Sequence, residues 1–271
     1  MNSVDDVLRR AGSEARRCLR TEKTLSRSTS HLGGLPEMPV AAEWPHRNGK
    51  PLAFLAQIDL DSAPLLEWPR WAPREGRLLF FYDVTEQPWG FDPKDRGCCA
   101  VVHVPRDASC VERLPPSDVP IDGRFRRKDL LLRAHTTYPS FERLVGCGKV
   151  SKAEFNAITK ALDALDPPQD SGSGRLHQLF GFPAPVQGDN MEFEAQLASN
   201  GVFCGDAKGY ASPEATALRS GAADWQLLFQ LDSDDDSDMM WGDVGMLYFW
   251  IRRQDAERGD FSNVWLILQC C

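Results

Sequence analysis

The sequence has no long hydrophobic run. Its longest apolar stretches, "MLYFWI" and "VWLIL", have the length of a strand, whereas a membrane helix needs about 20 apolar residues. The first residues, "MNSVDDVLRRAGSEARRCLR", also lack the apolar stretch of a signal peptide. These absences predict a cytoplasmic protein that does not bind membranes and whose eight cysteines stay reduced.

Positive charge is also scarce. Lysine and arginine number 31 against 39 aspartates and glutamates, which gives a net charge of −8. Proteins that bind nucleic acid gain much of their affinity by neutralising phosphates. The only basic run, "RFRRK" at 124–128, is more typical of a solvated loop than of a phosphate-binding patch. We therefore expect no nucleic-acid partner.

Common catalytic and cofactor motifs are missing too. The sequence contains no phosphate-binding loop, no G-x-S-x-G, no H-E-x-x-H and no G-x-G-x-x-G. Cysteine pairs of the C-x₂₋₄-C form, which aim two thiolates at one zinc ion, are absent as well. We predict no cofactor, and no residue stands out as catalytic.

An internal repeat is present. "HLGGLPEMP" at 31–39 is echoed by "QLFGFPAPV" at 178–186, "FLAQID" at 54–59 by "LLFQLD" at 227–232, and "GRLLFFY" at 76–82 by "GMLYFWI" at 245–251. The three matches occur in the same order in both halves of the chain. The second half has an insertion between its first and second match. This order indicates a duplicated unit.

Each unit has the pattern of two strands. Apolar runs surround Gln57 and Gln230, which occupy matching positions, as do Asp59 and Asp232. A buried glutamine must satisfy both its carbonyl and its amide group, so the pair predicts a repeated hydrogen bond to the backbone. The third match begins with glycine and continues with aromatic and β-branched residues, as strands do. We predict an α+β fold with largely antiparallel sheets, built from two pseudo-repeated halves.

The segment after Gln230, "LDSDDDSDMMWGD", is rich in aspartate. Asp232, Asp234, Asp236 and Asp243 fall at positions 1, 3, 5 and 12 of a calcium-binding loop. Position 6 is Ser237 instead of glycine, the bidentate glutamate is absent, and predicted strands flank the segment. The sequence therefore favours a turn between two strands, with the first three aspartates as the remaining candidates for a metal site.

Helices are expected in three places. Apolar residues recur at helical spacing over 4–20, which predicts an amphipathic N-terminal helix. Ser151 and Glu154 form a capping box for a second helix, and Ser140 begins a short third one. We predict an N-terminal helix and lead-in over 1–30, a first half over 31–168, a linker over 169–174 and a second half over 175–271, all in one globular unit.

"WGFDPKDRG" at 89–97 places Trp89, Phe91 and Arg96 around an Asp-Pro turn. Trp241 and Asp243, in "WGD" of the second half, are a weaker analogue. The segment fits a hairpin tip held by aromatic side chains. It also fits a recognition loop, because aromatic and arginine side chains are common in binding hot spots.

The combination "LGGLP", "GKPLAFLAQIDL", "GRLLFFYD", "WGFDP", "HQLFGFP", "LLFQLDSDD", "MMWGDVGMLYFWI" and "DFSNVWLILQC" resembles the YwqG-like family of bacterial proteins, from about His31 to Cys271. The resemblance implies an α+β fold with extensive sheet and internal duplication. The family is a domain of unknown function and implies no catalytic residues. Some relatives look as though they lie near toxin–immunity genes, which favours protein binding.

Two functional hypotheses follow. The first is a non-catalytic module that binds a protein or a small ligand, with immunity to a toxin as one version. The second is a metal-dependent or hydrolytic enzyme with a carboxylate site between the halves. The candidate site residues are Gln57, Asp59, Trp89, Phe91, Arg96, Gln230, Asp232, Trp241 and Asp243.

Overall fold

The computed structural model describes residues 4–64, 68–146, 150–168 and 172–270. The helices are α1 (Val4–Glu14), α2 (Phe141–Val145), α3 (Lys152–Asp163), α4 (Met191–Ser199), α5 (Ala207–Tyr210), α6 (Pro213–Leu218) and α7 (Arg253–Glu257). The strands are β1 (Arg16–Lys23), β2 (His31–Leu32), β3 (Glu37–Pro39), β4 (His46–Arg47), β5 (Lys50–Pro51), β6 (Ala53–Asp59), β7 (Arg77–Tyr82), β8 (Cys99–Val104), β9 (Cys110–Glu112), β10 (Lys128–Thr137), β11 (Gln178–Leu179), β12 (Trp225–Asp232), β13 (Met246–Arg252) and β14 (Trp265–Gln269).

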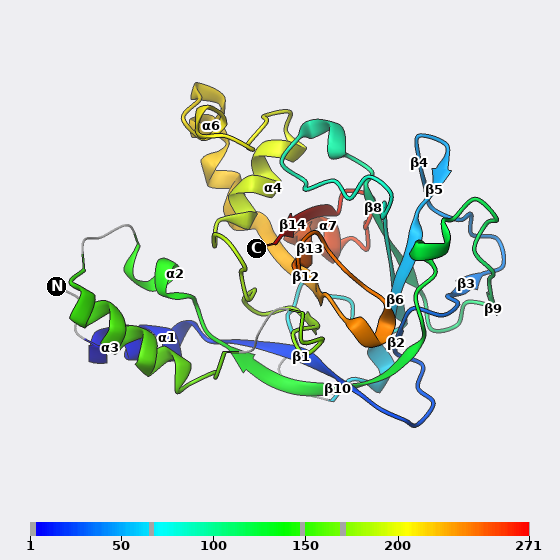
Figure 1. Cartoon of the computed structure of the whole chain (residues 1–271), viewed down its shortest axis with the longest axis horizontal. Coiled ribbons are helices and arrows are strands. Elements are labelled where there is room, and N and C mark those ends of the chain that lie inside the picture. Colours follow the sequence, from blue (N-terminus) through cyan, green and yellow to red (C-terminus); the bar gives the residue numbers. More distant parts are fainter. Residues whose placement is uncertain (1–3, 65–67, 147–149, 169–171, 271) are drawn as a thin grey trace.

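One large antiparallel sheet dominates the fold (Figure 1). Its ten strands follow the order β14-β13-β12-β11-β1-β10-β2-β6-β7-β8, while β3–β9 and β4–β5 form two small separate sheets. All of the strand pairs in the large sheet are antiparallel. The predicted α+β class and its antiparallel character are confirmed.

The two ends of the large sheet repeat each other about an axis between β1 and β10. Reading outward, β11, β12, β13 and β14 on one side correspond to β2, β6, β7 and β8 on the other. A register shift interrupts β6 between Phe54 and Ala56, and the matching shift interrupts β12 between Leu227 and Phe229. The duplicated unit predicted from the sequence therefore exists in three dimensions.

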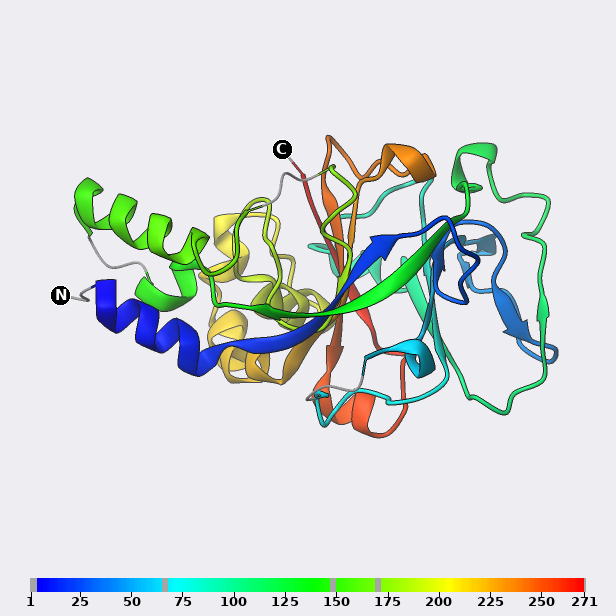
Figure 2. The ribbon, with the colours of Figure 1, turned by 90° about the horizontal axis from the view of Figure 1, so that it is seen from below.

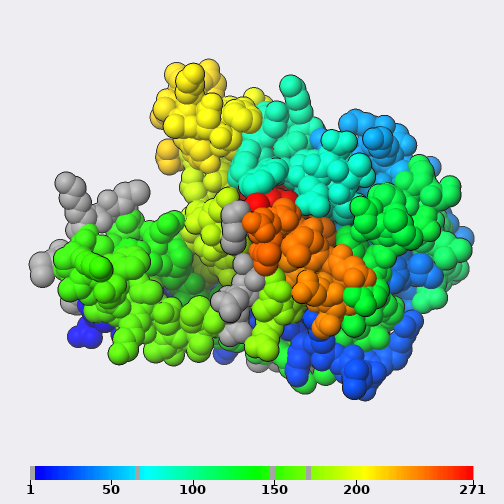
Figure 3. Space-filling model, in the orientation of Figure 1, coloured from blue at the N-terminus to red at the C-terminus, as the bar shows by residue number. Residues whose placement is uncertain are grey.

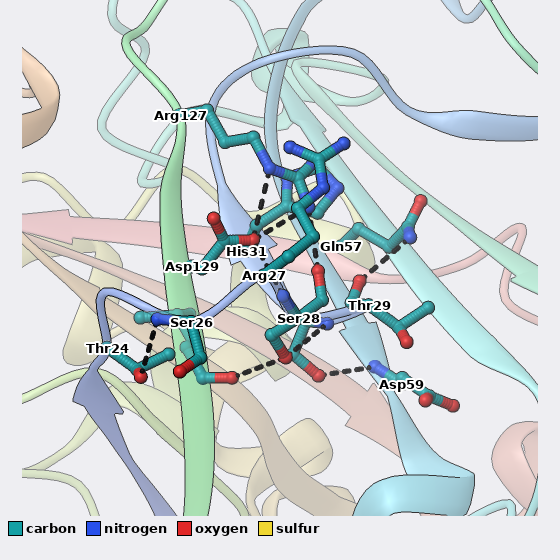
Figure 4. Close-up of polar contacts among 12 residues, drawn as sticks. Thr24, Ser26, Arg27, Ser28, Thr29, His31, Gln57, Asp59, Arg127 and Asp129 are labelled. Atoms are coloured by element: carbon teal, nitrogen blue, oxygen red, sulfur yellow. Dashed lines mark hydrogen bonds and ion pairs between the residues drawn. The ribbon is translucent and has the colours of Figure 1, made fainter.

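The matched glutamines make the predicted repeated hydrogen bonds. Gln57 accepts from the Glu37 amide at 2.9 Å and donates to the Thr29 carbonyl at 2.9 Å, as the close-up in Figure 4 shows for Thr29. Gln230 accepts from the Ala184 amide at 2.8 Å and donates to the Leu176 carbonyl at 2.7 Å. Each side chain joins the central strand of its half to residues in or next to the first match of the repeat, 31–39 or 178–186.

The large sheet folds back on itself, so that its two halves share a core. Phe80 of β7 packs against Phe229 of β12 with ring centroids 4.5 Å apart, and against Phe249 of β13 at 5.2 Å. All three rings are fully buried. Burial of these aromatic rings helps to join the halves.

The predicted helix over 4–20 is wrong in its second part. α1 ends at Glu14, and β1 runs from Arg16 to Lys23 between β10 and β11. Hydrogen bonding on both edges of β1 outweighs the helical spacing of its apolar residues. α1 packs on α2 and α3 at one end of the molecule, connected to the rest by β1 and β10 (Figure 2). The capping box of α3 and the Ser140 cap of α2 are confirmed.

The aspartate-rich segment is the connection between β12 and β13, as predicted, and it contains one short 3₁₀ turn over Asp235–Ser237. In Figure 3 it lies on the surface, in orange, beside the segment that leads into β10. The division into residues 1–30, 31–168 and 175–271 stays a prediction. Of the predicted linker 169–174, residues 169–171 lie outside the described residues. Within the described ranges, no helix is long and apolar enough to cross a membrane.

Candidate functional site

The predicted polar site residues are mostly internal. Gln57, Gln230 and Asp232 are completely buried, and Asp59 is half-buried at the end of β6. The amides of Asp59 and Asp232 donate equivalent hydrogen bonds, to Ser30 Oγ at 2.9 Å and to His177 Nδ1 at 3.0 Å. These residues are placed to hold the repeated unit together.

The aspartates of the β12–β13 connection form ion pairs and local hydrogen bonds. Lys23 Nζ lies 2.7 Å from Asp234 Oδ1 and 2.8 Å from Asp236 Oδ2, and Asp232 Oδ1 accepts from the Gly172 amide at 2.6 Å. Burial opposes ionisation of Asp234, but contacts with His177 and Lys23 outweigh it and hold its pKa well below the usual range. Among the residues that the structure describes, no group of three or more His, Cys, Asp or Glu side chains could hold a metal ion.

His177 is buried between two of these aspartates. Its Nδ1 accepts a hydrogen bond from the Asp232 amide, so the proton of the neutral ring lies on Nε2. Nε2 is 3.5 Å from Asp234 Oδ2. Only about 1% of the His177 side chain is exposed. His177 and Asp234 therefore hold the β12–β13 connection in place from inside the protein, where a substrate does not reach them.

The predicted recognition loop covers the edge of the sheet at β14. The Leu268 amide donates to the Trp89 carbonyl at 3.0 Å, and Trp265 Nε1 donates to the Gly90 carbonyl at 2.8 Å. Arg96 stacks over the Trp265 ring at 5.4 Å. Trp89 is 41% exposed, so part of its ring faces solvent. This loop satisfies backbone groups at an edge strand that would otherwise be open.

A substitution at Gly90 tests this docking. Gly90 has φ 84°, and a Cβ there would lie 1.8 Å from the Leu266 carbonyl oxygen. We expect Gly90→Ala to displace the loop and to lower the free energy of unfolding by about 2 kcal/mol. Hydrogen exchange should show faster exchange at the Leu268 amide. Gly97→Ala, with similar φ but open space around the site, is the matched control; an equal effect of both would contradict the docking.

Trp241 does not resemble Trp89 in its surroundings. It is 1% exposed, donates from Nε1 to the Asp232 carbonyl at 3.1 Å, and packs between Tyr82 and Phe125. Asp243 is exposed two residues further along. The structure does not bring these two residues together with Trp89, Phe91 and Arg96 into one described cavity.

A cleft that the sequence did not reveal lies between the two halves. It has a volume of about 290 Å³ and is lined by Arg16, Arg17, Trp68, Pro69, Trp71, Gly181, Gln226, Leu227 and Arg253. Trp68 and Trp71 come from the β6–β7 connection, the first two arginines from β1, and Arg253 from the start of α7. We call this the arginine–tryptophan cleft. An adjoining cavity of about 350 Å³ shares Arg16, Gln226 and Arg253 with it and extends to Arg143 and Glu192.

The charges of the cleft are unbalanced. Arg143 is bound by Asp189 and Glu192, its ion pair with Glu192 being 2.8 Å long. Arg16 lies 4.1 Å from the Phe182 ring centroid, and desolvation together with the charges of Arg143 and Arg253 lowers its pKa. Within the described part of the chain, neither Arg16 nor Arg253 has a carboxylate within ion-pair distance.

The repeat supplies an internal comparison for Arg17. The pairings of β1 with β11 and of β10 with β2 make Arg17 equivalent to Arg126, just before β10. Arg126 donates to Asp238 Oδ1 at 2.6 Å and to the Asp235 carbonyl at 3.0 Å, both from the β12–β13 connection. Arg17 instead donates to Thr136 Oγ1 at 2.7 Å. One half thus provides a carboxylate partner for its arginine, whereas among the described residues Arg17 is bound by a hydroxyl group instead.

The sequence did contain a partial signal for this cleft. "WPRW" at 68–71 places two tryptophans in the segment between the second and third matches of the first half. The helix predicted over 4–20 included Arg16 and Arg17, so their position in a strand beside that connection was not foreseen.

Comparison with known proteins identifies a family for this chain. A search of curated proteins found no match to this chain. A family model matches residues 30–270, which span the whole large sheet except β1. The chain therefore belongs to the family described as "Domain of unknown function (DUF1963)".

Proposed function

We propose that the protein is a non-catalytic binding module that takes an anionic ligand in the arginine–tryptophan cleft. The observation that carries this proposal is the placement of Arg16 and Arg253, both without a carboxylate partner among the described residues, in one cleft. The protein as a whole is acidic, so this local excess of positive charge is not a consequence of composition. Guanidinium groups bind carboxylates and phosphates with two parallel hydrogen bonds.

The cleft also favours an apolar or planar group beside the anion. Trp68 and Trp71 are half-buried and pack edge-on against Phe180, with ring centroids 5.4 Å and 5.3 Å away, so they are held in place. Small-molecule sites commonly combine aromatic walls with a few charged groups in about 300–1,000 Å³. The adjoining cavity, of about 350 Å³, falls in this range, and the cleft, of about 290 Å³, lies at its lower limit.

The anion has two possible sources, a free small molecule and an acidic segment of another protein. Within the chain, the contact of Arg126 with Asp238 is an example of an arginine that binds an acidic segment. Protein binding would agree with the resemblance to the YwqG-like family, some members of which look as though they lie near toxin–immunity genes. A cytoplasmic location is part of the same proposal. The carboxylate enzyme site is less well supported, because the cleft between the halves is not lined by Asp59, Asp232 or Asp243.

Calorimetric titration with phenyl phosphate tests the proposal. We expect saturable binding that is stronger than binding of inorganic phosphate or phenol and that weakens with added salt. The double variant Arg16→Gln/Arg253→Gln should bind at least about tenfold more weakly, since each charged hydrogen bond contributes about 1.5–3 kcal/mol. Arg175→Gln, at an exposed arginine before β11, is the matched control.

A second titration separates the two sources. A synthetic acidic peptide with the sequence of residues 232–243 replaces phenyl phosphate. Stronger binding of the peptide would identify a protein partner, and stronger binding of phenyl phosphate would identify a free anion. The proposal would be overturned if neither phenyl phosphate nor the peptide binds, or if the wild type and the double variant bind them equally well.

A further inference from the structure

A further cavity, partly lined by α4, shares no lining residue with the arginine–tryptophan cleft or with the cavity that adjoins it. It has a volume of about 460 Å³ and is lined by Phe91, Gln187, Gly188, Glu194, Cys204, Gly205, Asp206, Ala207, Tyr210 and Gln269. α4 carries Glu194 and packs beside β14, which carries Gln269 (Figure 1). The wall contains two carboxylates and two aromatic rings but no basic side chain.

Glu194 is incompletely satisfied in this wall. Only 7% of the residue is exposed, and Oε1 accepts a hydrogen bond from the Tyr210 hydroxyl at 2.8 Å. Oε2 is buried without a hydrogen-bond partner among the described residues. A buried polar atom without a partner is costly unless another group completes it.

Burial raises the pKa of Glu194 to about 7; the hydrogen bond from Tyr210 opposes this shift, and Glu192 and Asp189 add to it. The other titratable groups that face Glu194 come from the loop before α5, where Cys204 and Asp206 lie. β14 and the β7–β8 loop contribute Gln269 and Phe91, which do not titrate. The ionisable groups of the described residues that act on Glu194 or line the cavity are therefore acidic or neutral, so an added positive charge would be stabilised there.

We propose that this cavity binds an organic ammonium ion, with Glu194 as its counter-ion. The ammonium group would supply the missing hydrogen bond to Oε2 and balance the carboxylate charge. The rings of Phe91 and Tyr210 would contact the cation and its apolar portion, since aromatic faces attract cations. Asp206 adds negative potential but its Oδ1 already accepts from the Lys208 and Gly209 amides. This site is independent of the anion-binding function proposed above.

Benzylamine is the probe for the test, with benzyl alcohol as its neutral counterpart. We expect saturable binding of benzylamine and at least about tenfold weaker binding of benzyl alcohol. The ligand requires ionised Glu194, so affinity should rise about tenfold from pH 6 to pH 8, with proton release on binding near pH 7. Calorimetry in two buffers of different ionisation enthalpy measures that release.

Variants assign the effect to Glu194. Glu194→Gln retains the size of the side chain and its hydrogen bond with Tyr210, and it should lose both the preference for benzylamine and the pH dependence. Glu257→Gln, at an exposed glutamate of α7, should behave as the wild type. Thermal unfolding of each variant checks that it folds. Equal affinity for the two compounds, constant affinity from pH 6 to pH 8, unchanged binding by Glu194→Gln, or no binding of benzylamine would each overturn the proposal.

Discussion

Replacing Gln230 with leucine is expected to lower the free energy of unfolding by about 4 kcal/mol. The substitution keeps an apolar side chain of similar size but removes hydrogen bonds to the Ala184 amide and the Leu176 carbonyl. Leu176 is 4% exposed, so its carbonyl cannot turn to water. Each buried group left without a partner costs about 1–3 kcal/mol. Urea denaturation of the two proteins measures the difference.

The repeat provides a matched variant, Gln57→Leu. The same two bonds are lost, but Thr29 is exposed and its carbonyl can bind water. We expect a loss of about 2 kcal/mol, roughly half of that at Gln230. A loss below about 1 kcal/mol at both positions would show that these side chains do not hold the repeated unit together.

Replacing Lys23 with methionine is expected to lower the free energy of unfolding by about 3 kcal/mol. Lys23 is the cation that compensates Asp234, whose side chain is only 2% exposed. Removing one partner of a buried ion pair leaves the other charge uncompensated, which costs about 3–5 kcal/mol. The remaining hydrogen bonds of Asp234 to Ser237 and to the Asp236 amide reduce this cost.

The double variant Lys23→Met/Asp234→Asn should recover part of the loss, because no charge is then buried alone. The coupling between the two substitutions, measured by a double-mutant cycle, should be about 1–3 kcal/mol. Additive effects would contradict a direct interaction between the two side chains.

The same pair sets a pH dependence of stability. The pKa of Asp234 is lowered from 3.8, and that of Lys23 is raised from 10.5, where burial opposes the shift and hydrogen bonds to Asp234 and Asp236 outweigh it. The contribution of Asp234 to the free energy of unfolding is therefore complete above about pH 3.8 and is lost as the pH falls towards the lower pKa of Asp234 in the folded protein. The contribution of Lys23 is complete below about pH 10.5 and is lost as the pH rises above it. Lys23→Met should reduce both dependences.

The sequence predicted a feature correctly where that feature follows from neighbouring residues or from the repeat. The capping box at Ser151 and the strand runs around 54–59 and 227–232 depend on neighbouring residues, and the buried glutamines recur at matching positions of the repeat. All three are confirmed. The strand at 16–23 was missed because its conformation depends on pairing with residues 128–137 and 178–179, more than a hundred positions away.

The arginine–tryptophan cleft could not be derived from the sequence for the same reason. Arg16, Trp68 and Arg253 come from three distant segments, and only the folded sheet brings them to one cleft. The Asp-rich segment attracted attention because its charges are adjacent in sequence, yet Lys23 and Arg126 neutralise several of them. Whether a charged side chain lacks an ion-pair partner can be decided only when the structure has placed the residues around it.

The position of β1 has a consequence for how the two units depend on each other. The repeat makes β1 equivalent to β10, so β10 is the leading strand of the second unit although it lies within the predicted first half, 31–168. Yet β1 lies against β11 of the second unit, and β10 lies against β2 of the first. The units have therefore exchanged their leading strands, as the subunits of a domain-swapped homodimer do when a linker fuses them into a single polypeptide. If the polypeptide were cut between the units, each product would hold a strand that belongs in the sheet of the other, and the two could complete their folding only by reassociating.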